Sequence, residues 1–296
     1  MPQLQRVAIT GASGLVGSAL VGHLKSEGYT VQRLVRRNPV AADEVSWDPK
    51  TGHVDLNPLE GVDAIVHLAG AGVGDKRWSA KYKAEILNSR LLGTTAIAKA
   101  AAQLKPSVFI SASAIGFYGE TGNRAVTEAD RGGDDFLAAV CREWEAAADL
   151  ATESRTVKIR TGLVLEPTGG ALGRMLPLFK FGLGGKLGSG SQWWSWITLR
   201  DEIRAITHLL DANVEGPVNL TTPNPVTNQE FTATLARALH RPALFPVPGF
   251  ALKLALGGFS SEILGSTKVL PQALLDSGFS FEYPHLINAL SELVVE

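Results

Sequence analysis

Three glycines near the start of the chain have the spacing of a phosphate-binding turn. The segment reads Thr10-Gly11-Ala12-Ser13-Gly14-Leu15-Val16-Gly17. Gly11 would permit a tight turn, Gly14 would let the backbone approach a diphosphate, and Gly17 would allow a helix to pack closely on a strand. The N–H groups that open the following helix would face the anion, and the helix dipole would favour its charge. Because an apolar strand precedes this turn and a helical pattern follows it, we predict a dinucleotide site here rather than a plain strand–helix turn. The residues expected to contact the cofactor are Gly11, Ala12, Ser13, Gly14, Leu15 and Val16.

Two adjacent arginines indicate which dinucleotide the turn would hold. An NAD site usually offers a carboxylate to the ribose 2′-hydroxyl at the end of the second strand. The sequence there reads Leu34-Val35-Arg36-Arg37, with no acid. Guanidinium groups form charge-assisted, bidentate bonds with a phosphate. We therefore predict NADP as the cofactor, with Arg36 and Arg37 at its 2′-phosphate; two solvated surface arginines are the alternative.

Apolar runs alternate with helix-length amphipathic segments over the first two thirds of the chain. Near-continuous apolar strands are typical of a parallel sheet that helices cover on both faces. The alternation predicts an α/β fold, a doubly wound parallel sheet with right-handed crossovers. The expected strands are Leu4–Thr10, Thr30–Val35, Ala64–Leu68, Val108–Ser113 and Val157–Thr161, and the expected helices are Leu15–Glu27, Ala80–Gln103 and Phe136–Thr152.

The last third of the chain is rich in turn residues. Helical segments are expected at Asp201–Ala212, Asn228–His240 and Pro284–Val294, separated by Pro and Gly. This texture favours a smaller, mostly helical lobe at the carboxyl ends of the strands, where ligands bind in open α/β sheets. We therefore divide the chain into an NADP-binding domain, residues 1–170, and a substrate lobe, residues 171–296, partly interleaved with the first.

Charge and cysteine content restrict the possible partners. The 28 Lys and Arg residues nearly balance the 29 Asp and Glu residues, so the formal net charge is −1. This balance argues against a nucleic acid or an anionic membrane as the main partner. Cys141 is the only cysteine, so neither an internal disulfide nor a thiolate metal cluster can form. Since no secretory signal or spanning segment is recognisable, we expect a cytoplasmic monomer or homodimer that acts on a small molecule.

Further motifs make the chain resemble a known superfamily. Together with the glycine turn, His67-Leu68-Ala69-Gly70 and Ser111-Ala112-Ser113, followed by Tyr118-Gly119, look like the extended short-chain dehydrogenases/reductases. More closely, the chain resembles an atypical, epimerase-like family of uncharacterised proteins. The closer match rests on Arg77-Trp78, Asn88-Ser89-Arg90, Trp144-Glu145-Ala146-Ala147-Ala148 and the run from Gly182 to Ile197. The tail, residues 228–296, is similar to that family's small C-terminal domain of unknown function.

The resemblance implies further cofactor contacts. One segment should pass beneath the ribose and diphosphate, and another matches the backbone that usually faces the nicotinamide. Arg90 stands where extended members often have an asparagine, so its cation could reach the diphosphate or the ribose. Glu85 lies on the same helix within about a turn and a half, and a surface ion pair is the alternative for these two residues. The implied contacts are Leu68, Ala69, Gly70, Glu85, Arg90, Leu163 and Val164.

The same resemblance implies a catalytic serine without the usual tyrosine–lysine pair. In relatives the lysine lowers the tyrosine pKa, so that a phenolate can move a proton near neutral pH. Ser113 matches the serine, whereas Cys141 and Glu145 stand where the tyrosine and the lysine should be. A carboxylate in the lysine position would raise the pKa of a neighbouring acid. Tyr118 is the remaining phenol near Ser113, and it would either donate a proton to a substrate or simply pack.

A loop rich in tryptophan is a candidate for substrate recognition. Gln192, Trp193 and Trp196 follow a glycine-rich stretch, and aromatic faces beside an amide suit a sugar or a nucleobase. The alternative is that the tryptophans clamp the small lobe onto the large one. Two functions are compatible with the sequence. The first is an NADP(H)-dependent epimerase-like or oxidoreductase-like enzyme for a small polar substrate such as a nucleotide-linked sugar. The second is a catalytically silent module that senses the NADPH/NADP⁺ ratio. The missing tyrosine–lysine pair favours the second, and the polar tryptophan loop favours the first.

Overall fold

A large, mostly parallel sheet forms the centre of the protein. The structure is a computed structural model, which describes residues 4–295. The strand order is β12-β8-β6-β5-β1-β2-β3-β4, and every neighbouring pair is parallel except β3 and β4. The strands are β1 (Arg6–Thr10), β2 (Thr30–Val35), β3 (Glu44–Asp48), β4 (His53–Val54), β5 (Ala64–His67), β6 (Val108–Ala114), β8 (Arg155–Thr161) and β12 (Gly216–Leu220).

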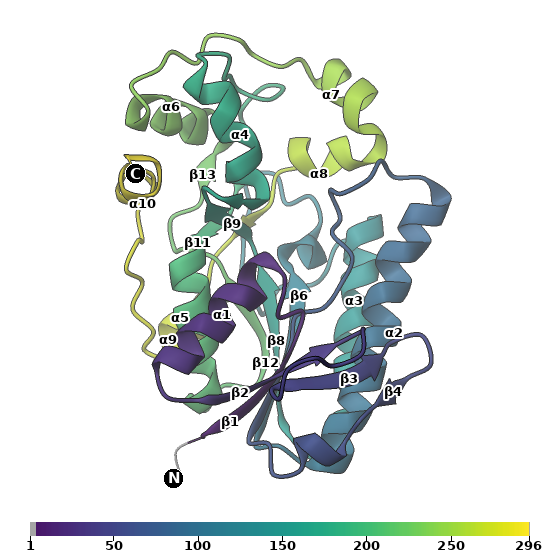
Figure 1. Cartoon of the computed structure of the whole chain (residues 1–296). Helices are drawn as coiled ribbons and strands as arrows, with labels where there is room; N and C mark the ends of the chain where they lie inside the picture. The colour runs from purple at the N-terminus through teal and green to yellow at the C-terminus, as the bar shows by residue number, and fades with distance from the viewer. Residues whose placement is uncertain (1–3, 296) are drawn as a thin grey trace.

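Helices cover both faces of this sheet. In Figure 1, α1 (Leu15–Ser26) and α5 (Leu199–Asp211) lie on one side, and α2 (Ala80–Leu104) and α3 (Phe136–Ala148) lie on the other. Because side chains alternate along a strand, Ile9 packs in the core beneath α1 while Ala8 packs in the core beneath α2. Both clusters are buried. The doubly wound α/β fold predicted from the sequence is therefore confirmed.

The rest of the chain builds a smaller lobe beyond the carboxyl edge of the sheet (Figure 1). Its core surrounds Trp196, Phe231 and Leu235. Three two-stranded sheets are separate from the large sheet: β9 (Leu163–Glu166) with β11 (Trp196–Thr198), β10 (Trp193–Trp194) with β13 (Val226–Thr227), and β7 (Ala125–Val126) with β14 (Lys268–Val269). The helices of the smaller lobe are α4 (Gly170–Lys180), α6 (Asn228–Ala238), α7 (Gly249–Leu256), α8 (Ser260–Leu264), α9 (Gln272–Asp276) and α10 (Leu286–Val295), and short 3₁₀ turns occur at η1 (Asn57–Leu59), η2 (Ile115–Tyr118) and η3 (Gly257–Phe259). Within residues 4–295, no helix combines the length and the apolar character needed to cross a membrane.

Strands β3 and β12 and helix α4 are among the elements that were not expected from the sequence. Strand β3 alternates polar and apolar residues, and β12 contains Pro217, which an edge strand tolerates because one side of its backbone needs no partner. Helix α4 begins after Gly169 and contains Pro177, so its sequence looks like a turn. Both α5 and β12 lie beyond residue 170 yet belong to the large sheet layer. The chain therefore passes between the lobes more than once, and the boundary at residue 170 remains a prediction.

Candidate functional site

The glycine turn sits tightly between β1 and the segment after β5. Gly11 has a φ of +68°, and a Cβ there would lie 2.8 Å from the carbonyl carbon of Leu68. A Cβ on Gly17 would lie 2.2 Å from the carbonyl oxygen of Gly11. The amide of Gly14 donates to that same oxygen at 2.9 Å. The turn thus has no room for side chains at two of the three positions, as a cradle for a diphosphate requires.

The start of α1 offers a binding site for an anion. Helix α1 begins at Leu15 with Gly14 at its N-cap, and Ser13 and Gly14 are exposed. In the described part of the chain, no side chain caps this helix end, and its first turn carries no acidic residue. The first-turn N–H groups and the positive end of the helix dipole therefore suit a phosphate. This arrangement fits a dinucleotide diphosphate.

Thr10, at the end of β1, holds the end of the neighbouring strand β5 in place. The sequence alone did not indicate this role. The Oγ1 of Thr10 accepts hydrogen bonds from the amides of Leu68 (3.1 Å) and Ala69 (3.3 Å) and contacts Nδ1 of His67 at 2.7 Å. Complete burial lowers the pKa of His67 to about 3, so this imidazole is neutral at physiological pH. His67 is therefore a core residue that supports the turn.

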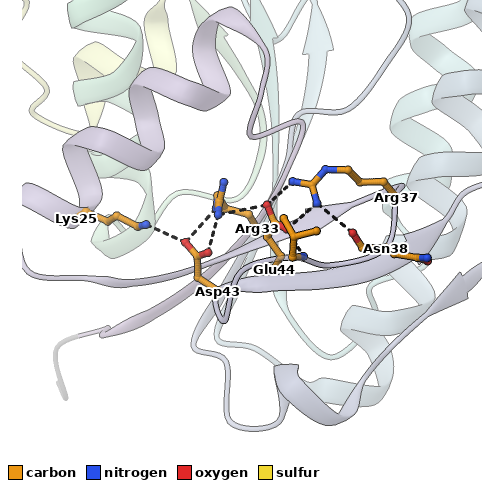
Figure 2. Close-up of polar contacts among 7 residues, drawn as sticks. Lys25, Arg33, Arg37, Asn38, Asp43 and Glu44 are labelled. Atoms are coloured by element: carbon orange, nitrogen blue, oxygen red, sulfur yellow. Dashed lines mark hydrogen bonds and ion pairs between the residues drawn. The ribbon is translucent and has the colours of Figure 1, made fainter.

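The two arginines after β2, Arg36 and Arg37, have different surroundings, and Figure 2 shows the contacts of Arg37. Arg37 forms a two-pronged pair with the buried carboxylate of Glu44, with N–O distances of 2.8 Å and 2.5 Å, and holds the pKa of that carboxyl well below its usual range. Arg33 bonds Asp43 and also lies 3.3 Å from Glu44. Arg36 is exposed, and among residues 4–295 it has no hydrogen-bond or ion-pair partner. All hydrogen-bond donors of the Arg36 guanidinium are therefore available to a phosphate, whereas Glu44 already occupies part of the Arg37 guanidinium.

Arg90 lies beside the other end of the predicted cofactor path. Its guanidinium donates to the carbonyl of Ala71 at 2.9 Å, and its carbons pass about 3.5 Å from a Cβ built on Gly70. It also stacks on Trp144, with 4.7 Å between its Cζ and the ring centroid. Glu85 points elsewhere, because it is exposed and pairs with Lys76 at 3.4 Å. Leu68 and Ala69 are half-buried, and Gly70 is exposed.

The segment that resemblance places at the nicotinamide follows β8. Leu163 and Val164 open β9 and pair in parallel with Trp196 and Ile197 of β11. The hairpin after β9 reaches the glycine turn, since a Cβ on Gly169 would lie 2.9 Å from a methyl group of Leu15. The geometry brings this segment near the start of α1. Its contact with a cofactor remains a prediction.

A closed ion pair lies beside Ser113 at the end of β6. The hydroxyl of Ser113 donates to Oε1 of Glu145 at 2.7 Å, and Nε and Nη2 of Arg160 donate to the two oxygens of Glu145 at 2.8 Å each. All three residues are buried. Glu145 therefore has both carboxylate oxygens occupied by groups from β6 and β8. Arg160 was not predicted, although a cation inside the apolar run Val157–Thr161 is an unusual feature of the sequence.

Tyr118 extends the same network. Its hydroxyl donates to Oδ1 of Asn219 at 2.7 Å and accepts from Arg160 at 2.9 Å. Burial raises the pKa of Tyr118 to about 12, despite the nearby guanidinium. The guanidinium of Arg160 also covers the ring of Phe117, at 3.5 Å from its centroid. Tyr118 is thus a buried, protonated phenol with both of its hydrogen-bonding roles filled.

Cys141 is a buried free thiol of α3. It is 3% exposed, and burial raises the pKa of its thiol to about 12. Its sulfur lies 3.7 Å from the carbonyl oxygen of Ala114. A thiol that stays protonated at neutral pH is a poor nucleophile and a poor proton donor.

The tryptophan loop is structural, and the substrate prediction for Trp196 is wrong. Trp196 is completely buried in the core of the small lobe, and its Nε1 donates to the carbonyl of Asn224 at 3.2 Å. The amide of Gln192 is also buried and donates to Leu187 at 3.0 Å, so it has little capacity for a ligand. Trp193 bonds Asn123 at 3.0 Å, and Lys268 covers its ring. Tryptophan buries a large apolar area, and here it joins the lobes.

A cavity of about 440 Å³ opens between the starts of α2 and α3 and the segment around α8. Trp78 and Phe136 supply aromatic walls at 5.3 Å from each other, and Lys83 stacks on both rings. Asp135 and Glu262 supply carboxyl groups, and burial followed by repulsion from Asp135 raises the pKa of Glu262 to about 7. The cavity therefore combines aromatic faces with charged groups of both signs. In residues 4–295, no cluster of three or more His, Cys, Asp or Glu side chains could hold a metal ion.

Comparison with known proteins identifies relatives over nearly the whole chain. Residues 7–136 match the model of the NAD dependent epimerase/dehydratase family, and residues 247–293 match a domain of unknown function, DUF1731. The chain is 43% identical over 289 residues to the epimerase family protein ML0860 of Mycobacterium leprae, which covers 96% of this chain and 94% of that protein.

Two solved structures share the fold. The crystal structure of human epimerase family protein SDR39U1 (isoform 2) with NADPH has a TM-score of 0.92 and 34% identity, and covers 99% of this chain and 100% of that chain. A nucleoside-diphosphate sugar epimerase from Corynebacterium glutamicum has a TM-score of 0.80 and 36% identity, and covers 99% of this chain but only 58% of its own.

Proposed function

Because the chain belongs to the NAD dependent epimerase/dehydratase family, we propose that it binds NADP(H) and acts on a small polar substrate as an epimerase-like or oxidoreductase-like protein. Two features together support the cofactor assignment: the tightly packed glycine turn at Gly11 and Gly17, called the glycine cradle below, and the exposed guanidinium of Arg36. The NADPH in the human relative supports the same assignment. A carboxylate does approach the end of β2, but Glu44 bonds Arg37 and leaves Arg36 for a 2′-phosphate.

The chemistry that we propose relies on hydride transfer without a tyrosine base. A bound nicotinamide supplies or accepts the hydride. Ser113 stands at the end of β6, where its oxygen can contact a reacting group when its proton turns away from Glu145. Tyr118 keeps its proton at neutral pH, so it supplies no phenolate. Proton exchange would then fall to water or to the substrate itself.

A nucleotide-linked sugar is the substrate class that we propose. The cavity beside Trp78, Phe136 and Glu262 offers aromatic faces and carboxyl groups, which suit a base and sugar hydroxyls. This cavity replaces the tryptophan loop as the candidate recognition site. The sugar-nucleotide epimerase of Corynebacterium glutamicum, which shares the fold at 36% identity, supports this class.

One observation favours a second function, the sensing of the NADPH/NADP⁺ ratio without turnover. The polar groups at the usual catalytic position, Ser113, Glu145, Arg160 and Tyr118, are buried and bonded to one another. Such a network rigidifies a core and needs no substrate to satisfy it. If one conformation of the protein binds one redox form of the cofactor more tightly, a change in the NADPH/NADP⁺ ratio would shift the population of that conformation.

Deuterium transfer distinguishes the two functions. NADPH carrying deuterium at C4 is incubated with the protein and a panel of keto-sugar nucleotides, whose carbonyl carbon can accept the hydride while its oxygen takes a proton from water, and mass spectrometry follows the label. An enzyme transfers the label stereospecifically, and Ser113→Ala lowers the rate by ~10²-fold or more. Ser111→Ala, a buried serine on the same strand, is the matched control and keeps the rate. Tight NADPH binding with no transfer to any substrate would favour sensing, and an unchanged rate in Ser113→Ala would remove this serine from the mechanism.

A further inference from the structure

Large apolar side chains are exposed at the end of the small lobe farthest from the sheet. Phe181 is 81% exposed, Phe250 76%, Leu244 75% and Leu254 75%. Soluble proteins expose single apolar residues routinely, but a cluster of them marks an interaction surface. We define the distal patch as Phe181, Leu183, Leu244, Phe245, Phe250 and Leu254.

The segments that carry the distal patch run side by side. The amide of Phe245 donates to Gly184 at 3.3 Å, and the amide of Val247 donates to Lys186 at 2.9 Å. The second segment leads directly into α7, Gly-Phe-Ala-Leu-Lys-Leu-Ala-Leu, in which no residue is buried. In Figure 1 the end of α4 lies at the top of the molecule near α6, and the connection from α6 runs across the top to α7 at the right. Helix α7 packs on α8 through half-buried residues such as Leu252, whereas Phe250 and Leu254 remain exposed, so only part of its apolar surface is covered.

The chain segments that carry the distal patch contain only positive charges. The sequence has no Asp or Glu between residues 167 and 200 or between residues 231 and 261. Lys180 and Arg241 lie in these segments and are exposed, and Lys186 is half-buried. Lys253 is also exposed, but it lines the cavity that contains Asp135 and Glu262. The net charge of −1 for the whole chain therefore conceals a local segregation, with the acidic residues elsewhere.

We propose that the distal patch docks the protein on an anionic lipid surface as a peripheral contact. Apolar side chains that enter the headgroup boundary, flanked by lysine and arginine, are the usual features of interfacial binding. A second copy is a poorer occupant, because a two-fold contact through this patch would bring its cations together. The whole-chain charge balance argued against a membrane, but the structure concentrates the cations where the apolar groups are. The proposal does not depend on the cofactor.

Co-sedimentation with vesicles tests this proposal. Full-length protein is mixed with phosphatidylcholine vesicles, with or without 30% phosphatidylglycerol, at low and at physiological salt. We expect binding to the anionic vesicles only, weakened by salt. Phe250→Ser/Leu254→Ser and Lys180→Glu/Arg241→Glu should each reduce the bound fraction at least fivefold. Leu150→Ser, another exposed apolar residue, and Lys99→Glu, an exposed lysine of α2, are the matched controls and should bind as the unchanged protein does.

Three results would overturn the proposal. The first is no sedimentation with anionic vesicles at low salt. The second is binding that the patch variants leave intact. The third is a dimer by light scattering that Phe250→Ser/Leu254→Ser dissociates, which would assign the patch to a second copy. Circular dichroism and NADPH binding confirm that each variant is folded.

Discussion

The hydroxyl of Ser113 donates a hydrogen bond to Oε1 of Glu145, and Nε and Nη2 of Arg160 donate to the two oxygens of the same carboxylate. The carboxylate is buried, and Arg160, which lies opposite Ser113 on the neighbouring strand, balances its charge. The three side chains therefore form a closed, buried ion pair in which both carboxylate oxygens are bonded.

Glu145→Gln should therefore cost stability. Breaking a buried ion pair leaves an uncompensated charge on Arg160, and such losses are ~3–5 kcal/mol in the free energy of unfolding. Glu143→Gln, an exposed glutamate of the same helix, should change stability by less than ~0.5 kcal/mol. Urea denaturation measures both variants. Equal stabilities would mean that the pair contributes nothing to the fold.

The glycine turn gives a second, paired prediction. Gly17→Ala should lose NADPH affinity at least tenfold and cost ~1–3 kcal/mol of stability, because its Cβ would clash with the backbone oxygen of Gly11. Gly22→Ala lies in the same helix with nothing within 4 Å of its Cβ, so it should stabilise the protein by ~0.5–1 kcal/mol. Calorimetry gives the stabilities, and fluorescence titration gives the affinities. Unchanged NADPH affinity in Gly17→Ala would show that the close packing at Gly17 is not needed for cofactor binding.

The buried carboxyl group of Glu202 should make the free energy of unfolding depend on pH. This carboxyl is buried, Thr161 donates to Oε1 at 2.8 Å, and burial raises its pKa to about 8 from an ordinary value of 4.5. Since the folded state holds the proton more tightly, its stabilising effect is complete below pH 4.5 and is lost as the pH rises through 8. The free energy of unfolding should fall by roughly 1–4 kcal/mol over this range.

Glu202→Gln tests that assignment. The amide does not titrate, so the fall in stability between pH 5 and pH 9 should become shallower. Glu215→Gln, an exposed residue, should keep the slope of the unchanged protein. Parallel slopes for Glu202→Gln and the unchanged protein in denaturation series would show that another group causes the pH dependence.

The sequence predicted those parts of the fold whose pattern is strong within one segment. Strand β2 was expected and found at Thr30–Val35, and α1 and α2 were found within a residue of their expected ends. Strand β12 and α4 were missed because Pro217 and Pro177 indicate turns in isolation, and only the neighbouring elements make strand and helix stable there. Tertiary packing overrode local propensity in both cases.

In the candidate site, too, local motifs could be predicted from the sequence and contacts between distant segments could not. The glycine turn is a local motif, so its position followed from spacing alone. The ion pair between Glu145 and Arg160 joins α3 to β8, and the partner choice of Arg37 depends on β3; neither pairing follows from the order of residues. Trp196 was assigned to a substrate because tryptophan serves both recognition and burial, and only the structure shows that it is buried.

The central claim is that the guanidinium of Arg36 and the glycine cradle hold a 2′-phosphorylated dinucleotide. Fluorescence titration with NADPH and NADH tests it most directly, on the unchanged protein, on Arg36→Ala and on the control Lys99→Ala, an exposed lysine of α2. The account predicts a preference for NADPH that Arg36→Ala reduces by roughly tenfold, since a charge-assisted bond to phosphate contributes about 1.5 kcal/mol, while NADH affinity and Lys99→Ala are unaffected. Equal affinities for the two nucleotides in the unchanged protein, or a preference that survives Arg36→Ala, would contradict it.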